Sequence, residues 1–163
     1  MNKKQLFENY LMQNIDSAYR FAYTYAKNRE DAEDIVNESV VKAIKSIHHL
    51  KMPEHIKPWF YKIIVNTALT YLKRKSKISY LDYEDLNDID GTEDDYSELT
   101  LNSLIEKLDL KYKSIIVLRF LEGMSLSEIS QTLGINENTV KTRLYNALKL
   151  LKVDMESDEY EKF

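Results

Sequence analysis

Residues 125–151, with the sequence SLSEISQTLGINENTVKTRLYNALKLL, constrain most strongly what this chain can fold into. Ser125 and Glu128 have the spacing of a capping box, in which two side chains satisfy backbone amides of the first helical turn. Gly134 can adopt the positive φ that ends a helix sharply, and Asn136 is a good N-cap for the next helix. This segment therefore predicts two helices joined by a tight turn, a helix-turn-helix.

The second predicted helix has two different faces. Its inner face is formed by apolar residues at helical spacing, namely Val140, Leu144, Ala147, Leu148 and Leu151. Its outer face carries polar and basic residues, namely Asn138, Thr139, Lys141, Thr142, Arg143 and Asn146. Side chains of these types contact base edges and phosphates in DNA grooves. The alternative is a helical hairpin with an ordinary solvated face, because short motifs also occur by chance.

The composition favours an all-α fold. The 163 residues include only three Gly and two Pro, and apolar residues recur at helical spacing almost throughout. Cysteine is absent, which excludes disulfides and cysteine-bound metals and suits a reducing compartment. The first residues lack the apolar core of a signal peptide, and no apolar run approaches the length of a membrane span. We therefore expect a cytoplasmic protein.

Charge is strongly segregated along the chain. The net charge is −4, but residues 82–98 hold nine acids without a Lys or Arg, and residues 154–163 hold five acids and one Lys. The remaining residues carry 22 Lys and Arg against 13 Asp and Glu. A basic structured part, with the acids confined to a linker and a tail, is compatible with a nucleic-acid partner.

Five further helices are predicted from apolar residues three and four positions apart. They span residues 6–26, 30–47, 58–75, 99–110 and 113–121. Pro58 suits a first helical position, because a missing N–H is harmless there. The connector 48–57 is long for a turn between helices and contains all three histidines.

The outer face of the predicted helix 30–47 needs an explanation. It carries Asp34, Asn37, Glu38, Val41 and Lys45. Acidic residues in the first turn stabilise a helix through its macrodipole, which accounts for residues 30–33. Val41 is an apolar residue beside Glu38 and has no such explanation. The face fits either a solvated helix or a protein-docking surface, with an acidic rim around a small apolar spot.

Basic residues gather at the end of the predicted helix 58–75. Lys73, Arg74 and Lys75 either complement the helix dipole or form a ledge for phosphates. The connector adds His, Lys and Met side chains, a mixture that suits single-stranded or melted nucleic acid. The histidines lack metal-ligand spacing, so no metal is expected. No phosphate loop or nucleophile motif is present, so we predict no catalytic residue and no enzyme activity.

Three segments resemble the extracytoplasmic-function class of bacterial sigma factors. They are NREDAEDIVNESVVKAIKSI at residues 28–47, KPWFYKIIVNTALTYLKRKSK at 57–77 and LDLKYKSIIVLRFLEGMSLSEISQTLGINENTVKTRLYNALKLLK at 108–152, in the order of the family. The resemblance implies an all-α protein of two small helical domains joined by an acidic linker. The implied parts are a region-two domain (1–80), the linker (81–98), a region-four helix-turn-helix domain (99–153) and an acidic tail (154–163).

The resemblance also implies roles for individual residues. The helix at 31–43 would dock on a coiled coil of the largest catalytic subunit of core RNA polymerase. The residues implied in docking are Asp31, Asp34, Ile35, Glu38 and Val41. Of the two explanations for the outer face of this helix, the resemblance therefore favours a protein-docking surface. Region two would recognise and help to melt the promoter element near minus ten, with His48, Lys51, Met52, His55, Lys57, Asn66, Tyr71, Lys73 and Arg74. Region four would read the minus-thirty-five element, with Asn138, Thr139, Lys141, Thr142, Arg143 and Asn146.

A chain of this kind would bind core RNA polymerase and promoter DNA and direct promoter-specific transcription initiation, as in bacterial stress responses. The resemblance implies a cognate anti-sigma protein, often membrane-anchored, as a further partner. No cofactor, small-molecule substrate or homo-oligomer is expected. Two alternatives remain: a stand-alone helix-turn-helix regulator that binds DNA as a dimer, and a sigma-like regulator that binds polymerase without initiating transcription. Neutralising the linker acids is expected to change DNA binding or polymerase assembly, unless the linker is only a spacer.

Overall fold

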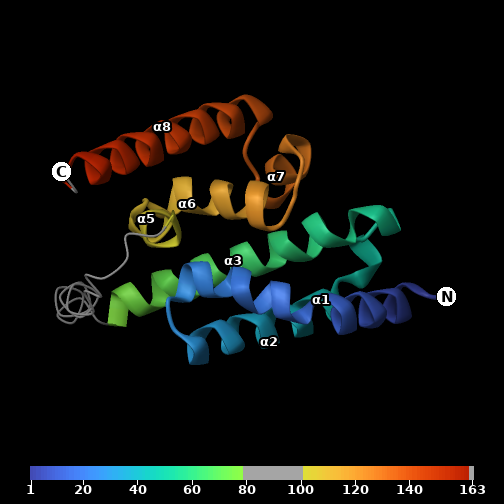
Figure 1. The fold of residues 1–163 in the computed structure, drawn as a ribbon. Helices are drawn as coiled ribbons and strands as arrows, with labels where there is room; N and C mark the ends of the chain where they lie inside the picture. The colour runs from blue at the N-terminus through green and yellow to red at the C-terminus, as the bar shows by residue number, and fades with distance from the viewer. Residues whose placement is uncertain (79–100, 162–163) are drawn as a thin grey trace.

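The computed structural model describes residues 1–78 and 101–161, and at residues 77–78 and 154–161 the backbone alone. Within these residues every regular element is helical, as the sequence predicts. The elements are α1 (Lys3–Ala26), α2 (Arg29–Lys45), η1 (Ile47–His49), η2 (Pro53–His55), α3 (Ile56–Ile78), α5 (Leu101–Lys107), α6 (Leu110–Ile116), η3 (Val117–Leu121), α7 (Leu126–Leu133) and α8 (Glu137–Glu161). Figure 1 shows α1, α2 and α3 as one layer, with the helices α5 to α8 stacked on it. The acidic segment 81–98 lies outside the described residues.

α1 and α2 form a helical hairpin with a very short turn. Asn2 starts α1 by accepting a hydrogen bond from the Gln5 N–H at 2.8 Å. Lys27 ends α1 in the left-handed conformation, with a φ of 65°. Asn28 then caps α2 by accepting a hydrogen bond from the Asp31 N–H at 2.8 Å. Because one helix stops where the next begins, α2 packs back along α1.

α3 is the central helix of the molecule. Two 3-10 turns, η1 and η2, lead into it, and the buried side chain of Leu50 anchors the connector between them. Phe60, Ile64 and Ala68 recur at four-residue spacing along α3 and are fully buried. α3 contacts α1 and α2 within its own layer and α7 from the other layer.

The helix-turn-helix forms as the sequence predicts. The Ser125 hydroxyl accepts a hydrogen bond from the Glu128 N–H at 3.1 Å, and the Glu128 carboxylate accepts one from the Ser125 N–H at 3.0 Å. Gly134 ends α7 with a φ of 67°. Asn136 caps α8 by accepting a hydrogen bond from the Thr139 N–H at 2.8 Å. The local signals thus determine the position of the turn between α7 and α8.

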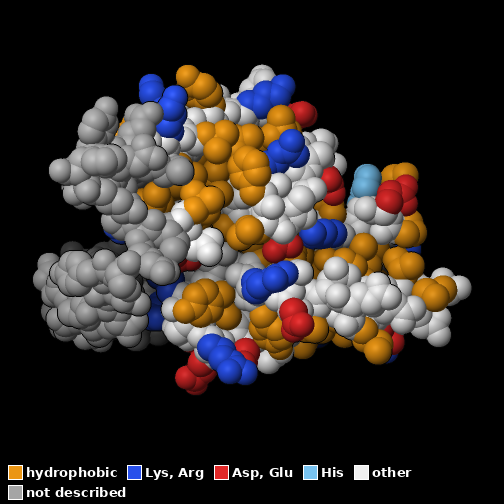
Figure 2. Space-filling model, in the orientation of Figure 1, with side chains coloured by type: hydrophobic (Ala, Val, Ile, Leu, Met, Phe, Trp, Pro, Cys, Tyr) orange, Lys and Arg blue, Asp and Glu red, His pale blue; other side chains and the backbone are white. Residues whose placement is uncertain are grey.

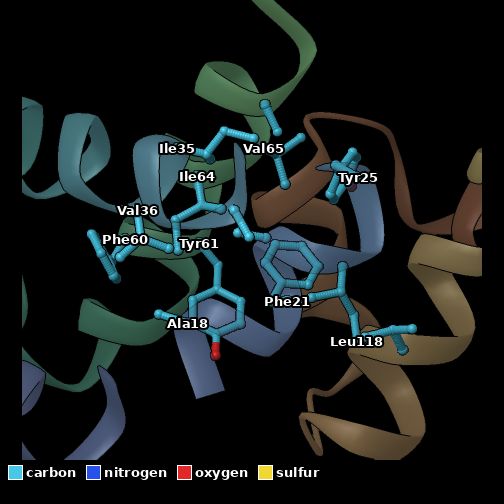
Figure 3. Packing of buried hydrophobic residues seen from close by; sticks show 14 of the residues in the cluster. Ala18, Phe21, Tyr25, Ile35, Val36, Phe60, Tyr61, Ile64, Val65 and Leu118 are labelled. Atoms are coloured by element: carbon cyan, nitrogen blue, oxygen red, sulfur yellow. The ribbon is translucent and has the colours of Figure 1, made fainter. Parts of the chain in front are cut away.

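One buried hydrophobic cluster runs through both layers. The rings of Phe21 and Tyr61 stack in the first layer, with centroids 4.8 Å apart. Leu118, Met124 and Ile129 of the second layer belong to the same cluster, and Figure 3 shows Leu118 beside the first-layer residues. A smaller cluster packs α5 and α6 against α8. The second domain therefore packs on the first as well as being joined to it by the linker.

Two apolar side chains whose spacing places them on the inner stripe of a helix are exposed. Ile44 of α2 and Leu148 of α8 are 39% and 42% exposed, because the buried stripe of each helix is narrower than its apolar pattern. α8 continues to Glu161, into the predicted acidic tail, since no Gly or Pro interrupts residues 137–161.

In the described part of the chain, no helix has both the length and the apolarity that a bilayer crossing requires.

Candidate protein and nucleic-acid interfaces

α2 presents an exposed face that combines carboxylates with apolar side chains. Asp34 and Glu38 are exposed, and Glu38 forms an ion pair with Lys42 at 3.6 Å. Val41 is 51% exposed, and Ile44 adds a second apolar side chain three residues further along. An exposed apolar spot beside charged groups is typical of a protein-docking surface. Sequence reasoning missed Ile44, because its spacing also fits the inner stripe.

Ile35 does not belong to this face, contrary to the prediction that it contacts a partner. Its side chain is 1% exposed and lies in the hydrophobic cluster. The three- and four-residue spacing that places Ala32 and Val36 inside also turns Ile35 inward. Ile35 therefore holds α2 on the core and forms no part of the exposed face of this helix.

Asp31 links the start of α2 to the end of α3. Its carboxylate accepts hydrogen bonds from Asn28 Nδ2 at 2.6 Å and Lys75 Nζ at 3.4 Å, and it is also hydrogen-bonded to the Tyr71 hydroxyl. Burial acts to raise the pKa of Asp31, but the hydrogen bonds from Tyr71, Asn28 and Lys75 and the Lys75 charge together lower it. A predicted docking residue and a predicted minus-ten residue, Tyr71, are thus bound to each other.

The connector between α2 and α3 forms an open hollow of about 280 Å³. The hollow is lined by His49, Leu50, Lys51, Met52, His55, Pro58, Trp59, Lys62 and Gln131. It brings together three predicted minus-ten residues, Lys51, Met52 and His55. Sequence reasoning missed Trp59 and Lys62, although their three-residue spacing on one helix was an available signal. It also missed Gln131, which α7 contributes from the other domain.

The other predicted minus-ten residues lie outside the hollow. Asn66, Lys73 and Arg74 are exposed along α3. His48 is also exposed, and its ring lies 4.1 Å from that of His49, centroid to centroid. The basic end of α3 is therefore accessible to phosphates, and it lies outside the connector hollow.

Lys57 points to the second domain. Its Nζ donates a hydrogen bond to the backbone carbonyl of Glu122 at 2.7 Å and lies 3.4 Å from the Glu122 carboxylate. That carboxylate also accepts a hydrogen bond from the Tyr61 hydroxyl at 2.9 Å. Burial and the negative charge of Glu122 raise the pKa of Tyr61 above its usual value. Glu122 thus has two partners on α3.

Two further tyrosines mark the contact between the domains. Burial raises the pKa of Tyr25 to about 12, although a hydrogen bond with Ser114 of α6 opposes the shift. Burial and the charge of Glu122 also raise the pKa of Tyr10. Among the described residues, the buried Tyr10 hydroxyl has no hydrogen-bond partner. Burial is thus the main cause of the raised pKa of both tyrosines, with Tyr25 beside α6 and Tyr10 near Glu122.

The start of α8 carries the predicted minus-thirty-five residues. Asn138, Lys141 and Thr142 are exposed, whereas Thr139, Arg143 and Asn146 are half-buried. The Thr139 hydroxyl donates to Asn136 at 2.9 Å and the Thr142 hydroxyl donates to the Asn138 carbonyl at 3.0 Å, so both hydroxyls bond within the helix end. The amide of Asn138 and the ammonium of Lys141 are thus the most accessible polar groups of the set.

Hydrophobic side chains gather on the surface of the second domain, among Lys and Arg side chains (Figure 2). The exposed large hydrophobic residues of this domain are Leu101, Phe120, Leu121, Tyr145, Leu148, Leu150 and Val153. Such exposure is a feature of protein-contact surfaces. In the part of the chain that the structure describes, no group of His, Asp or Glu side chains is arranged to hold a metal ion.

Two family models match the chain. The model of sigma-70 region 2 matches residues 11–78, and that of sigma-70, region 4 matches residues 98–151. The RNA polymerase sigma factor SigV of Bacillus subtilis (strain 168) is 43% identical over 164 residues, covering 98% of this chain and 99% of that protein. The ECF RNA polymerase sigma factor SigW of the same organism is 30% identical over 157 residues, covering 84% and 82%.

Solved structures share the fold. The sigma factor RpoE from Bartonella quintana, in complex with the anti-sigma factor NepR, matches with a TM-score of 0.72 at 20% identity, over 93% of this chain and 98% of that chain. CnrH, in complex with the cytosolic domain of CnrY, matches with a TM-score of 0.66 at 21% identity, over 93% and 88%. At these identities the likeness concerns the fold.

Proposed function

This chain belongs to the ECF RNA polymerase sigma factors, which bind core RNA polymerase and direct it to promoters, and we propose which of its surfaces perform each task. The exposed face of α2, with Asp34, Glu38 and Val41, binds the core polymerase. The connector hollow and the basic end of α3 engage the minus-ten element. The start of α8 reads the minus-thirty-five element.

The exposure of Val41 is the observation that carries the docking proposal. Val41 is 51% exposed and has the exposed Ile44 three residues further along the helix, and a protein interface buries such a pair of apolar side chains at its centre. Asp34 and Glu38 flank Val41 at helical spacing and supply charge at the rim. Rim charges mainly set the association rate and the choice of partner, while the apolar centre contributes affinity.

The connector hollow suits a melted minus-ten base. Trp59 offers a ring on which an unstacked base can lie, and Lys51 and Lys62 supply cations for the adjoining phosphates. Duplex DNA offers no unstacked base, so this surface favours melted DNA over the double helix. Lys73 and Arg74 supply two further exposed cations at the far end of α3.

The start of α8 suits duplex recognition in a major groove. The second helix of a helix-turn-helix places its N-terminal residues against base edges. The Asn138 amide can form a pair of hydrogen bonds with adenine, and the Lys141 ammonium can contact a phosphate or guanine. Each domain alone neutralises few phosphates and binds DNA weakly, but attachment of both to one polymerase makes the second contact intramolecular.

A cognate anti-sigma protein is proposed as a further partner. The fold match to RpoE, which was solved with an anti-sigma factor, supports this assignment. The exposed hydrophobic residues of the second domain fit a protein partner as well. The proposed place of action is the cytoplasm, where RNA polymerase works.

In vitro transcription tests the assignment of α2. Purified protein is combined with bacterial core polymerase lacking any sigma factor, on a fragment from upstream of the gene for this chain. We expect a discrete transcript with the wild-type protein and none with Asp34→Lys, because the reversed charge opposes docking. Glu8→Lys, the same charge change at an exposed site on α1, is the control and should leave the transcript unchanged.

Different failures of this experiment favour different alternatives. Tight polymerase binding without a transcript from any tested promoter would favour a sigma-like regulator. Specific DNA binding in the absence of polymerase, with no polymerase binding, would favour a stand-alone regulator. Equal activity of Asp34→Lys and Glu8→Lys, with retained helical circular dichroism, would remove α2 from the docking surface.

A further inference from the structure

Glu122 lies at the centre of the polar contact between the two domains. Its side chain is 4% exposed, although it follows directly after a surface turn of the second domain. Both groups that satisfy its carboxylate, the Tyr61 hydroxyl at 2.9 Å and the Lys57 ammonium at 3.4 Å, belong to α3 of the first domain. A buried carboxylate is costly unless it is paired and hydrogen-bonded, so this position depends on contact between the domains.

The backbone before Glu122 is shaped to deliver it to α3. Residues 117–121 form a π-helical turn, and the Glu122 N–H donates to the Val117 carbonyl, five residues back, at 3.0 Å. Gly123 then reverses the chain with a φ of 66°. π-helical turns are rare and occur frequently at functional sites. The local geometry thus points to a role for Glu122 beyond ordinary packing.

The same contact removes groups from the proposed minus-ten surface. Lys57 is one of the proposed minus-ten residues, and its ammonium cannot neutralise a phosphate while it is bound to both oxygen groups of Glu122. In this arrangement the anion paired with Lys57 is the Glu122 carboxylate of the second domain. Gln131 of α7 also forms part of the wall of the connector hollow. The second domain thus covers part of the surface that the first domain offers to DNA.

The packed arrangement is also too short to read both promoter elements. Elements near minus ten and minus thirty-five are about 25 base pairs apart, or about 85 Å at the rise of B-DNA. The longest helix, α8, has 25 residues and measures about 38 Å. Because α7 packs on α3, the distance between the two proposed DNA-reading surfaces is comparable to the length of one such helix. It is much shorter than the distance of about 85 Å between the two promoter elements. Simultaneous recognition therefore requires the domains to separate.

We propose that Glu122 is the latch of an autoinhibited closed form, in which it holds the second domain on α3 through Tyr61 and Lys57. The latch opens when polymerase holds the domains apart and a promoter phosphate replaces the Glu122 carboxylate at Lys57. This inference rests on the proposed placement of the two DNA-reading surfaces.

Distance measurements between two spin labels test the latch directly. The chain has no cysteine, so Gln13→Cys on α1 and Lys149→Cys on α8, both at exposed positions, give one label in each domain. We expect one narrow, short distance in the free protein, and a longer distance when core polymerase and a promoter fragment are added. In the free protein, Glu122→Gln should shift the population to the longer distance. The expected change in the closed-to-open ratio is about ten-fold, since the lost hydrogen bonds are charge-assisted.

Matched variants separate the latch from general effects of charge. Tyr61→Phe removes the hydroxyl donor and keeps the ring that stacks on Phe21, so it should shift the population in the same direction. Glu8→Gln, the same charge change at an exposed site, should leave the distance unchanged. If Glu122→Gln loses helical circular dichroism, Tyr61→Phe decides the question.

Two results would overturn the proposal. One is a long or broad distance in the free wild-type protein, which would mean that the closed form is not populated. The other is an unchanged short distance in both Glu122→Gln and Tyr61→Phe. Because the free-protein distance involves no polymerase, its outcome is separate from the proposed function. If Glu122→Gln shifts the free protein to the longer distance but the wild-type chain gives no transcript, the result counts against the proposed function and not against the latch.

Discussion

The hydroxyl of Tyr71, near the end of α3, is hydrogen-bonded to the carboxylate of Asp31 in the first turn of α2. Burial and this hydrogen bond raise the pKa of Tyr71, so its hydroxyl stays protonated as a donor. Lys75 adds an ammonium 3.4 Å from the same carboxylate. The start of the proposed docking helix is therefore fixed to the end of the proposed minus-ten helix.

Replacing Asp31 tests how much this link stabilises the first domain. Asp31→Asn should lower the free energy of unfolding at pH 7 by about 1 kcal/mol, since it weakens several charge-assisted hydrogen bonds at a partly solvated site. Urea unfolding followed by circular dichroism measures the change. Asp34→Asn, an exposed residue on the same helix, is the control and should change the stability by less than about 0.5 kcal/mol.

The pH dependence of the same variant has a definite sign. The pKa of Asp31 is lower in the folded protein than in the unfolded chain, where it is about 3.9. The carboxylate therefore stabilises the fold above the unfolded value, and this contribution is lost as the pH falls through the lower folded value. The stability difference between wild type and Asp31→Asn should be complete at pH 7 and should shrink below about pH 4. A constant difference across this range would exclude the ionised carboxylate as its source.

Val41 should contribute to polymerase affinity without contributing to stability. Val41→Ala removes apolar area from the centre of the proposed docking face and should weaken core-polymerase binding by roughly ten-fold, the scale of a moderate interface contact. Its melting temperature should stay close to that of the wild type, because the side chain is 51% exposed. Leu69→Ala on α3, at a side chain that is 47% exposed, is the matched control. Equal affinities of the two variants, measured by fluorescence anisotropy, would argue against the α2 face.

The elements that sequence reasoning predicted well are those determined by neighbouring residues. The capping box of Ser125 and Glu128, the left-handed Gly134 and the cap at Asn136 each depend on backbone groups within a few positions. The exposure of Val41 followed in the same way, from the helical repeat of its own segment. Such signals determine where a helix starts, where it stops and which side faces outward.

The features that sequence reasoning missed depend on segments far apart in the chain. Glu122 and Tyr61 are 61 residues apart, and no local pattern indicates that the Tyr61 hydroxyl donates a hydrogen bond to the Glu122 carboxylate. The same holds for Gln131, which reaches the connector hollow only because α7 packs on α3. Ile44 shows a second limit, since periodicity gives a direction with an error of about one position. Ile35 is different, because its spacing agrees with its burial and only the resemblance to the family assigned it to docking. The exact edge of a buried stripe is determined by the neighbouring helix.

Gly134 should be needed for its backbone conformation alone. Its φ is 67°, and a Cβ built there would have no atom within 4 Å, so a side chain would meet open space. Gly134→Ala should therefore destabilise the protein by about 1 kcal/mol through the left-handed conformation. Gly134→Asn, which tolerates this conformation better, should be less destabilising. Thermal unfolding of both variants measures the difference, and a larger loss with Asn than with Ala would indicate that steric contacts decide instead.

Lys141 and Asn138 should differ in what they contribute to DNA binding, although both lie on the exposed start of α8. A phosphate contact weakens binding to all sequences when it is removed, and it lowers the slope of log affinity against log salt by about one. A base contact acts only on the matched base and has little effect on that slope. We therefore expect Lys141→Ala to weaken binding to every duplex equally, and Asn138→Ala to relax the preference at one base pair by about 1–3 kcal/mol. Holoenzyme binding to a set of single-base promoter variants at several salt concentrations separates the two effects, with Lys149→Ala, further along the exposed side of α8, as the control for charge. A uniform loss with Asn138→Ala would assign Asn138 to the backbone and leave base recognition to the half-buried Arg143 or Asn146.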